Sequence, residues 1–337
     1  MIRKILATII VLVIALVLLV AVWPQLFGLQ SAPIVAQVVS LRGLDVAIAL
    51  VVAVGVGLLA IAWRGARRFL GTLVVLLLAF CLASFGILAS RGFGGTTAAS
   101  RPPSTITVLS WNTKGDAPGT AKIAKLALAD HADVIALPET TQRTGFDLAL
   151  MLKAAGRPMW VYSAAHGYTY ESHATTLLIS AALGEYSVDV SHGDTSVLSS
   201  IIAKPHDPAE PTIVAVHAVS PQPQEMLNWR ADLRFLSTVC SGRNLIMAGD
   251  FNSTLDALDS LSTRPGADFG GCTDSGRAVG AAAVGTWPTT LPALLGAQID
   301  HVMYTSPWRV AGMRVIQSED GAGSDHRPIL ATLSDQR

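Results

Sequence analysis

Three long apolar runs in the first 90 residues constrain this chain more than any other feature. The runs carry no charged residue and cover residues 5–23, 46–63 and 69–90. A helix needs about 20 apolar residues to cross the ~30 Å hydrocarbon layer of a bilayer. Packed as a soluble bundle, three uncharged helices would have no polar face to present to water. The sequence therefore predicts three transmembrane helices within residues 1–90, with the lipid bilayer as their partner.

The charged residues divide the chain into two unlike parts. Residues 1–100 contain seven Lys and Arg and one acidic residue, whereas residues 101–337 contain 17 basic and 23 acidic residues. An acidic domain lacks the basic surface that dedicated DNA-binding proteins need for phosphate contacts. Residues 91–104 are rich in Gly, Pro, Ser and Thr and predict a linker. One domain is then expected over residues 105–337.

Basic residues also predict the orientation of the membrane part. Arg3 and Lys4 precede the first run, and three arginines lie between residues 64 and 68. Lys and Arg beside membrane helices concentrate on the cytoplasmic side. A cytoplasmic N-terminus and an extracytoplasmic C-terminal domain at the cell membrane are therefore expected. Cleavage of the first run as a signal peptide, the alternative, would leave the domain on the same side.

The C-terminal part alternates many short β-rich segments with few helical ones. This pattern favours two packed sheets with helices outside them, and about 230 residues can bury a full core. Strands are predicted at residues 105–111, 133–139, 159–163, 174–179, 197–203, 212–218, 244–249, 299–304 and 327–333, and helices at 121–130 and 224–239.

The cysteines indicate an oxidising compartment. Cys240 and Cys272 lie in the part predicted to be exported, where disulfides persist. A bridge between them would contribute roughly 3–4 kcal/mol on the chain-entropy model. Two free buried thiols are the alternative, and Cys81, inside the third run, is read as a small apolar filler.

Polar residues recur where the predicted strands end. They are Asn112, Glu139, His217, Asp250, Asn252, Asp300, Asp325 and His326. Strand ends present side chains in a shared crevice. Carboxylate and amide oxygens suit Mg²⁺, and imidazoles can exchange protons with a phosphoryl oxygen. No Ser or Cys stands out beside a base as a nucleophile.

Six motifs carry these residues: LSWN (109–112), DVIALPE (133–139), VHAVSP (216–221), MAGDFN (247–252), QIDHV (298–302) and GSDH (323–326). In this order they resemble the endonuclease/exonuclease/phosphatase superfamily, which contains the DNase I-like nucleases, neutral sphingomyelinases and inositol-polyphosphate phosphatases. The resemblance covers residues 105–333 and implies a four-layer α/β/β/α sandwich. With three spans in front, the chain is similar to a membrane-anchored bacterial member.

The resemblance implies a divalent-metal site. Glu139 together with Asn112, and Asp325 on a second side, match the family's ligands for Mg²⁺ or Mn²⁺. Two departures stand out. Lys114 occupies a position where many family nucleases carry an acidic residue, and the usual QE is a PE at residues 138–139.

The resemblance also implies catalytic roles. Asp250 matches the residue that orients or deprotonates the attacking water, and Asn252 the amide that positions that water or a phosphate oxygen. His326 matches the histidine that stabilises the phosphate in the transition state, and Asp300 the carboxylate that orients it. His217 matches a second histidine that donates a proton or contacts the phosphate.

These inferences predict a magnesium-dependent phosphohydrolase or phosphodiesterase that acts on lipid-linked or extracellular phosphate esters. A surface-tethered nuclease is the first alternative, and a non-catalytic binding domain on the same fold is the second. No protein partner is predicted. Roles in packing and in function both stay open for His301, Trp287 and Arg277.

Overall fold

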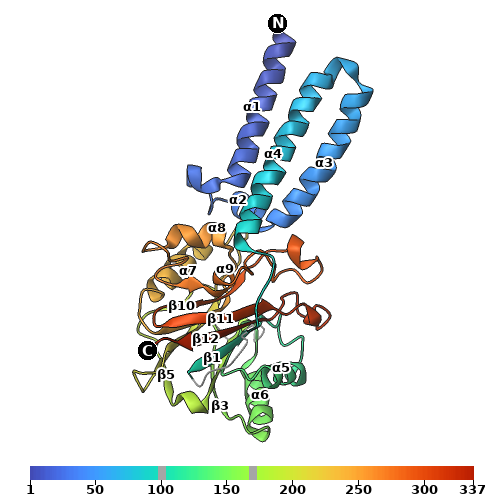
Figure 1. Cartoon of the computed structure of the whole chain (residues 1–337). Helices are drawn as coiled ribbons and strands as arrows, with labels where there is room; N and C mark the ends of the chain where they lie inside the picture. The colour runs from blue at the N-terminus through green and yellow to red at the C-terminus, as the bar shows by residue number, and fades with distance from the viewer. Residues whose placement is uncertain (98–103, 167–172) are drawn as a thin grey trace.

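A computed structural model describes residues 1–97, 104–166 and 173–337. Three helices, α1 (Ile2–Val22), α3 (Arg42–Ala62) and α4 (Arg67–Arg91), form an elongated bundle that stands on the rest of the chain (Figure 1). All three predicted apolar runs are confirmed as helices, each long and apolar enough to cross a membrane. The short helix α2 (Val35–Ser40) joins α1 to α3 at the foot of the bundle.

The C-terminal part contains two six-stranded sheets within the described residues. The first has the order β11-β12-β1-β2-β4-β3, built from β1 (Thr105–Ser110), β2 (Val134–Leu137), β3 (Met159–Ala164), β4 (Thr175–Ser180), β11 (Trp308–Val315) and β12 (Ile329–Asp335). The second has the order β5-β6-β7-β8-β10-β9, built from β5 (Tyr186–Val188), β6 (Ile201–Pro205), β7 (Thr212–His217), β8 (Leu245–Asp250), β9 (Thr273–Asp274) and β10 (Asp300–Tyr304). The β1–β2 and β7–β8 pairs are parallel, and the other pairs are antiparallel.

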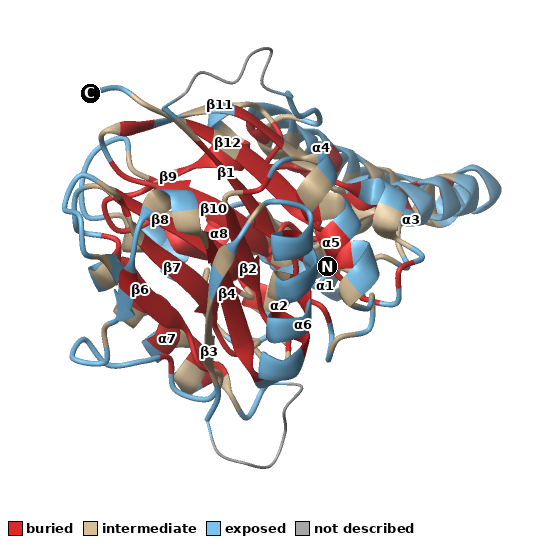
Figure 2. Cartoon of the chain, turned by 90° about the horizontal axis from the view of Figure 1, so that it is seen from below, coloured by how far each residue is buried: buried red, intermediate tan, exposed pale blue. Residues whose placement is uncertain are grey.

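Alternation along the strands builds four layers. Val108 of β1 packs between the two sheets, whereas Leu109 packs against the helices α5 (Thr120–Ala129) and α6 (Gln142–Ala154). In the second sheet Val214 packs outward, against α7 (Met226–Val239) and α8 (Leu255–Leu258). A further short helix, α9 (Ser275–Ala278), precedes β10. Figure 2 shows the buried strands and the exposed outer faces of the helices, which confirm the predicted α/β/β/α sandwich.

Seven helices and strands lie outside the predicted set: α2, α6, α8, α9, β5, β9 and β11. The two longest of them, α6 and β11, were missed for identifiable reasons. In α6, Phe146 and Leu150 are exposed, so the apolar spacing of this helix does not mark a single face. Strand β11 contains a bulge between Val310 and Gly312, which interrupts the two-residue alternation typical of a strand.

The predicted disulfide is confirmed. Cys240 at the end of α7 is bridged to Cys272 before β9, with the Cα atoms 5.7 Å apart. Both residues belong to the core cluster outside the second sheet. Cys81 is a free thiol buried in the bundle, as its position in an apolar run predicted.

The bundle is fixed to the domain by a buried ion cluster. Asp256 of α8 is 2% exposed and receives Arg42 Nη2 at 2.7 Å and Arg91 Nη1 at 2.9 Å. Arg42 also donates to the carbonyls of Ala21 and Val22, at 3.1 Å each. Burial alone would raise the pKa of Asp256, but the two guanidinium groups outweigh it and hold that pKa well below its usual range. The ends of all three long helices therefore meet at one carboxylate of the domain.

The predicted linker, residues 91–104, begins along the domain surface. Arg91 is the last residue of α4. The Gly94 amide donates to the Gly280 carbonyl at 3.1 Å, and Thr96 forms a bridge with Met313. A side chain at Gly92, where φ is +81°, would clash with the backbone of Gly280. Residues 98–103 of this segment lie outside the described residues.

Candidate active site

Strand register places three of the predicted residues side by side at one edge of the second sheet. His217 is opposite Asp250 in the parallel β7–β8 pair. Asp250 is opposite Asp300 in the antiparallel β8–β10 pair. All three are at most 1% exposed. The sequence places polar groups at the ends of three strands, and sheet pairing gathers them into one row.

Asn112, which follows β1, connects this row to the first sheet. Its Nδ2 donates to Glu139 Oε1 and to Asp250 Oδ2, at 3.0 Å each. Its Oδ1 accepts from the Lys114 amide at 3.0 Å. Because Glu139 follows β2 of the first sheet and Asp250 ends β8 of the second, one buried carboxamide joins the two sheets at the candidate site.

Three residues at the site have a left-handed backbone conformation. Lys114, Glu139 and Asn252 have φ of 51°, 51° and 46°, in the left-handed region that few non-glycine residues occupy. The Glu139 carbonyl accepts from the Thr113 hydroxyl at 2.6 Å and from the Gly115 amide at 2.9 Å, which stabilises its conformation.

A close backbone approach precedes Asp250. A Cβ at Gly249 would lie 2.0 Å from the Val216 carbonyl oxygen. Only glycine therefore fits here, between β7 and β8. The GDFN motif supplies this glycine at the position that brings the Asp250 and His217 strand ends together.

His326 forms the centre of an acid–base chain. Its Nδ1 lies 2.9 Å from Asp300 Oδ2, and its Nε2 lies 3.8 Å from Asp250 Oδ2. Burial alone would lower the pKa of His326, but Asp300 and Asp250 outweigh it and raise the pKa to about 10. Burial, with Asp300 adding to it, raises the pKa of Asp250 to about 7. The His326 imidazolium thus faces a carboxyl group whose pKa burial holds above its usual range.

His217 has the opposite character. Its Nδ1 lies 3.1 Å from the Thr175 hydroxyl. Its Nε2 is buried, has no hydrogen-bond partner within the described residues, and lies 4.0 Å from Glu139 Oε1. Burial, with smaller contributions from His326 and His173, lowers the pKa of His217 to about 3. A neutral ring therefore presents an unoccupied polar atom to the site.

The two remaining predicted residues, Asn252 and Asp325, are partly exposed. Asn252 Nδ2 donates to the Ala218 carbonyl at 2.9 Å and to Asp250 Oδ2 at 3.2 Å. The Asp325 side chain is 34% exposed; its Oδ2 accepts from Trp287 Nε1 at 3.4 Å and lies 3.5 Å from Lys114 Nζ. Asp325 thus contacts Lys114 and Trp287, while the other seven predicted residues form one connected group.

Two sets of side chains have the chemistry to hold a metal ion. Glu139 and Asn112 offer hard oxygen ligands of the kind that Mg²⁺ prefers. The ligand atoms of Asp250, Asp300 and His326 lie within 4.8 Å of one another. His326 Nδ1 is already paired with Asp300, so only its Nε2 would remain for a metal in this second set. A divalent cation therefore fits the oxygen-rich edge of the site.

Several supporting residues were not predicted. Ser324 donates to the Asn112 carbonyl at 2.7 Å and accepts from the His326 amide at 3.0 Å. Trp111 Nε1 donates to the His326 carbonyl at 2.9 Å. Ser324 and Trp111 lie inside two of the six motifs, so their support of the site could have been predicted from the sequence. Thr175, at the start of β4, lies in none of the motifs and could not have been predicted in this way.

Two residues with open roles are structural. His301 is buried, with Nδ1 2.8 Å from Asp274 and Nε2 2.9 Å from the Ser253 carbonyl. Arg277 pairs with Asp259 and Asp268, at 2.7 Å each. Within the described residues, neither side chain forms a hydrogen bond or ion pair with the eight predicted site residues.

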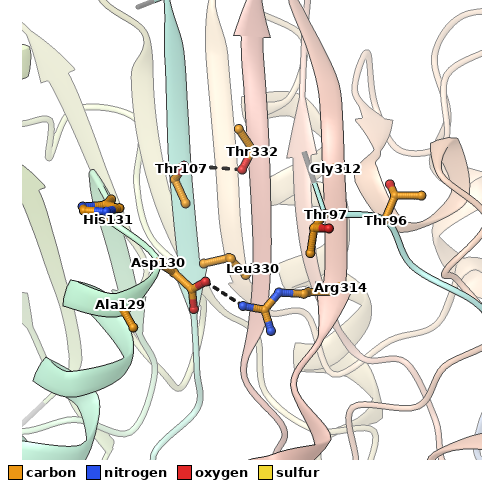
Figure 3. Close-up of a pocket in the computed structure, with 10 residues that line it drawn as sticks. All are labelled: Thr96, Thr97, Thr107, Ala129, Asp130, His131, Gly312, Arg314, Leu330 and Thr332. Carbon is orange, nitrogen blue, oxygen red and sulfur yellow. Dashed lines mark hydrogen bonds and ion pairs between the residues drawn. The ribbon is translucent and has the colours of Figure 1, made fainter. Parts of the chain in front are cut away.

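A separate hollow lies at the other end of β1, around Thr107. Asp130 and Arg314 form an ion pair of 2.6 Å across it, as Figure 3 shows. None of the eight predicted site residues lines this hollow. This hollow is therefore separate from the candidate active site.

Comparison with known proteins agrees with this geometry. Residues 109–326, more than half of the chain, match the Endonuclease/Exonuclease/phosphatase family. A search of curated proteins finds no match.

Solved structures show the same fold. A humanized D. rerio TDP2 with 14 mutations is 18% identical, with a TM-score of 0.54 over 68% of this chain and 99% of that one. An endonuclease/exonuclease/phosphatase from Beutenbergia cavernae is 17% identical, with a TM-score of 0.51 over 69% and 72%. D. rerio TDP2 complexed with a single-strand DNA product is 16% identical, with a TM-score of 0.51 over 68% and 99%.

Proposed function

Because the chain belongs to the endonuclease/exonuclease/phosphatase family, we propose that it is a membrane-anchored phosphoric ester hydrolase that depends on a divalent metal ion. The chain of contacts from Asp300 through His326 to Asp250 carries this proposal. Attack of water on phosphorus needs a base for the water and positive charge for the phosphoryl oxygens. The Asp250 carboxylate and the His326 imidazolium supply both. They belong to one group of neighbouring side chains, His217, Asp250, Asn252, Asp300 and His326, which we call the catalytic edge.

Each residue of the edge has a defined task in this reaction. Asp250 accepts the proton of the attacking water, and Asn252, bonded to Asp250, positions that water or a phosphoryl oxygen. His326 stabilises the negative charge that develops on the phosphoryl oxygens. Asp300 holds the His326 ring through Nδ1. His217 contacts the phosphate through its unpartnered Nε2.

The metal is assigned to Glu139, Asn112 and Asp325. Mg²⁺ or Mn²⁺ bound there would supply positive charge that offsets the charge on the phosphoryl oxygens. The oxygen donors of Glu139 and Asn112 support this assignment, because Asp250 and His326 are then left free to move protons. Lys114, beside Asp325, brings a further positive charge to the mouth of the site.

We place the catalytic domain outside the cytoplasm, at the cell membrane. The arginines between residues 64 and 68, together with Arg3 and Lys4, favour a cytoplasmic N-terminus and an odd number of crossings before the domain. The disulfide between Cys240 and Cys272 supports an oxidising compartment. Lipid-linked or extracellular phosphate esters are the substrates within reach of such a site.

A surface-tethered nuclease is the second candidate. The similar TDP2 structure holds a single-strand DNA product, which favours nucleic acid as a substrate of this fold. The excess of acidic residues after residue 100 argues against it, since phosphate backbones bind basic surfaces. A non-catalytic binding domain is the third, and the presence of Glu139 and His326 argues against it.

Removal of the metal is the first test. The full chain in lipid nanodiscs would be given a chromogenic phosphodiester, plasmid DNA, a sphingomyelin-like lipid and a polyprenyl pyrophosphate, with Mg²⁺ or with EDTA. We expect hydrolysis of the diester and of at least one lipid with Mg²⁺, and a loss of about 10²-fold or more with EDTA. Cleavage of DNA alone would establish the nuclease instead. A folded protein inactive on every substrate would overturn the proposed hydrolase.

The pH dependence tests the assigned proton positions. Asp250 must be ionised to accept a proton, so kcat/KM for the diester should rise with pH through about 7. His326 must be protonated, so activity should fall again as pH approaches about 10. Initial rates between about pH 5 and pH 11 would show a broad maximum between these limits. Activity that is highest at the acid end would contradict the role of Asp250 as a base.

A further inference from the structure

A cavity of about 320 Å³ opens between the catalytic edge and the segment that joins α1 to α3. Its size lies in the range of small-molecule binding sites. Leu41 lines it from the membrane part, and Pro221, Trp287, Ala297 and Ile299 line it from the domain. Five polar residues also line it: Gln37, Ser40, Ser220, Gln222 and Asn252. Most of the wall area exposed to the cavity is nevertheless apolar.

One residue of the catalytic edge, Asn252, belongs to the wall of this cavity. Asn252 lines it, and the same Asn252 side chain donates to Asp250 Oδ2 at 3.2 Å. Trp287 also lines it, and its Nε1 donates to Asp325 at 3.4 Å. A molecule whose phosphate lies at Asp250 would thus have its adjoining atoms in an apolar space.

The segment that forms the opposite wall also carries an exposed apolar surface. Trp23, Leu26, Phe27, Ile34 and Val38 are 56%, 54%, 42%, 75% and 38% exposed. Apolar side chains clustered on a surface indicate contact with a partner or with lipid, and Trp favours the membrane interface. Because these residues follow the first span, lipid is the apolar medium available to them.

Contacts to the domain fix this segment in place. Gln25 Nε2 donates to the Asp256 carbonyl at 2.9 Å, and Arg230 Nε donates to the Ser31 carbonyl at 2.8 Å. Gln37 Nε2 donates to the Pro221 carbonyl at the rim of the cavity. These hydrogen bonds therefore hold the segment against the domain, where it forms one wall of the cavity.

We propose that this cavity binds the hydrocarbon chain next to the phosphate of a lipid drawn from the membrane that holds α1, α3 and α4. The segment from Trp23 to Leu41 is then a specificity element of the enzyme. The proposal rests on the proposed function, because it assumes that the catalytic edge binds a phosphate ester. It adds the residues that select a lipid over a soluble ester.

The test compares esters that differ only in chain length. The full chain in nanodiscs would hydrolyse 4-nitrophenyl methyl phosphate and 4-nitrophenyl dodecyl phosphate, which share one leaving group. Binding of methylphosphonate and dodecylphosphonate, which lack an ester bond, would be measured in parallel by calorimetry. Long chains also partition into the nanodisc lipid, so variants decide the outcome. Leu41→Gln changes the cavity, and Leu150→Gln, at a residue 65% exposed on α6, is the matched control.

Each fully buried methylene changes affinity by about fourfold. We therefore expect the dodecyl-to-methyl ratio of kcat/KM to fall at least tenfold in Leu41→Gln relative to Leu150→Gln, and the phosphonate binding ratio to fall with it. Ser40→Phe, which fills the cavity from α2, should do the same if Leu41→Gln does not fold. Ratios equal to the control in both variants would overturn the cavity proposal and leave the hydrolase intact. Chain-dependent phosphonate binding without any ester hydrolysis would overturn the hydrolase and support the cavity.

Discussion

Replacing His326 with alanine should reduce phosphate ester hydrolysis by more than tenfold while the protein stays folded. The imidazolium faces Asp250 at 3.8 Å and is held by Asp300 at 2.9 Å, so its removal takes positive charge away from the reacting phosphate. Groups that stabilise such charge or move its proton contribute about 10²–10⁴-fold. The rates of Mg²⁺-dependent diester hydrolysis by the variant and the parent chain measure the effect.

A histidine outside the site provides the control. His206 has a side chain 56% exposed and contacts Ser187 at 2.6 Å, away from the catalytic edge. His206→Ala should retain the parent rate. Thermal unfolding of both variants separates lost chemistry from lost structure. Unchanged turnover in His326→Ala would defeat the mechanism assigned to this edge.

The second large effect is expected at the junction of the membrane part and the domain. Asp256→Ala should destabilise the chain by about 3–5 kcal/mol, because Arg42 and Arg91 would remain buried without their counter-charge. For a domain of this size that corresponds to a fall in Tm of roughly 10 °C. Thermal unfolding of the full chain in nanodiscs, followed by circular dichroism, measures it.

An exposed pair gives the matched comparison. Asp147 lies 4.0 Å from Arg143 on α6, and both side chains are more than half exposed. Asp147→Ala should change stability by less than about 1 kcal/mol, as is usual for surface ion pairs. An Asp256→Ala protein as stable as Asp147→Ala would show that the buried cluster does not fix the domain.

The cluster also has a defined pH dependence. The pKa of Asp256 in the folded protein lies well below its unfolded value of 3.8. The stability that Asp256 contributes is therefore fully present above that unfolded value, and it is lost as the pH falls from there toward the folded pKa. The stabilisation that Asp256 contributes is thus fully present at any pH at which such a protein is ordinarily handled.

The catalytic edge could be predicted from the sequence because its geometry follows from strand ends. His217, Asp250 and Asp300 each begin or end a β-rich segment, and pairing in register brings such positions together. The apolar runs were equally predictable, since an uncharged run of about 20 residues matches the thickness of a bilayer and exceeds what a soluble core helix usually sustains.

The junction could not be predicted in this way. Arg42 and Asp256 are 214 residues apart and belong to no motif, so nothing local relates the two charges. The helix α2 has only six residues, too few to show a helical period. The cavity beside Leu41 exists only because these distant segments meet.

The buried cluster at Asp256 has a consequence for how this protein can be divided. All eight residues of the predicted site follow residue 105, so a soluble fragment beginning there would keep every one of them. It would lose Arg42 and Arg91, the cationic partners of a carboxylate buried beside the core, and it would lose the wall that Leu41 contributes to the cavity. The helical bundle and the C-terminal domain are therefore not exchangeable modules. Transplanting the domain onto another anchor should preserve its reaction chemistry but not its choice of substrate, and the two halves are expected to be inherited together.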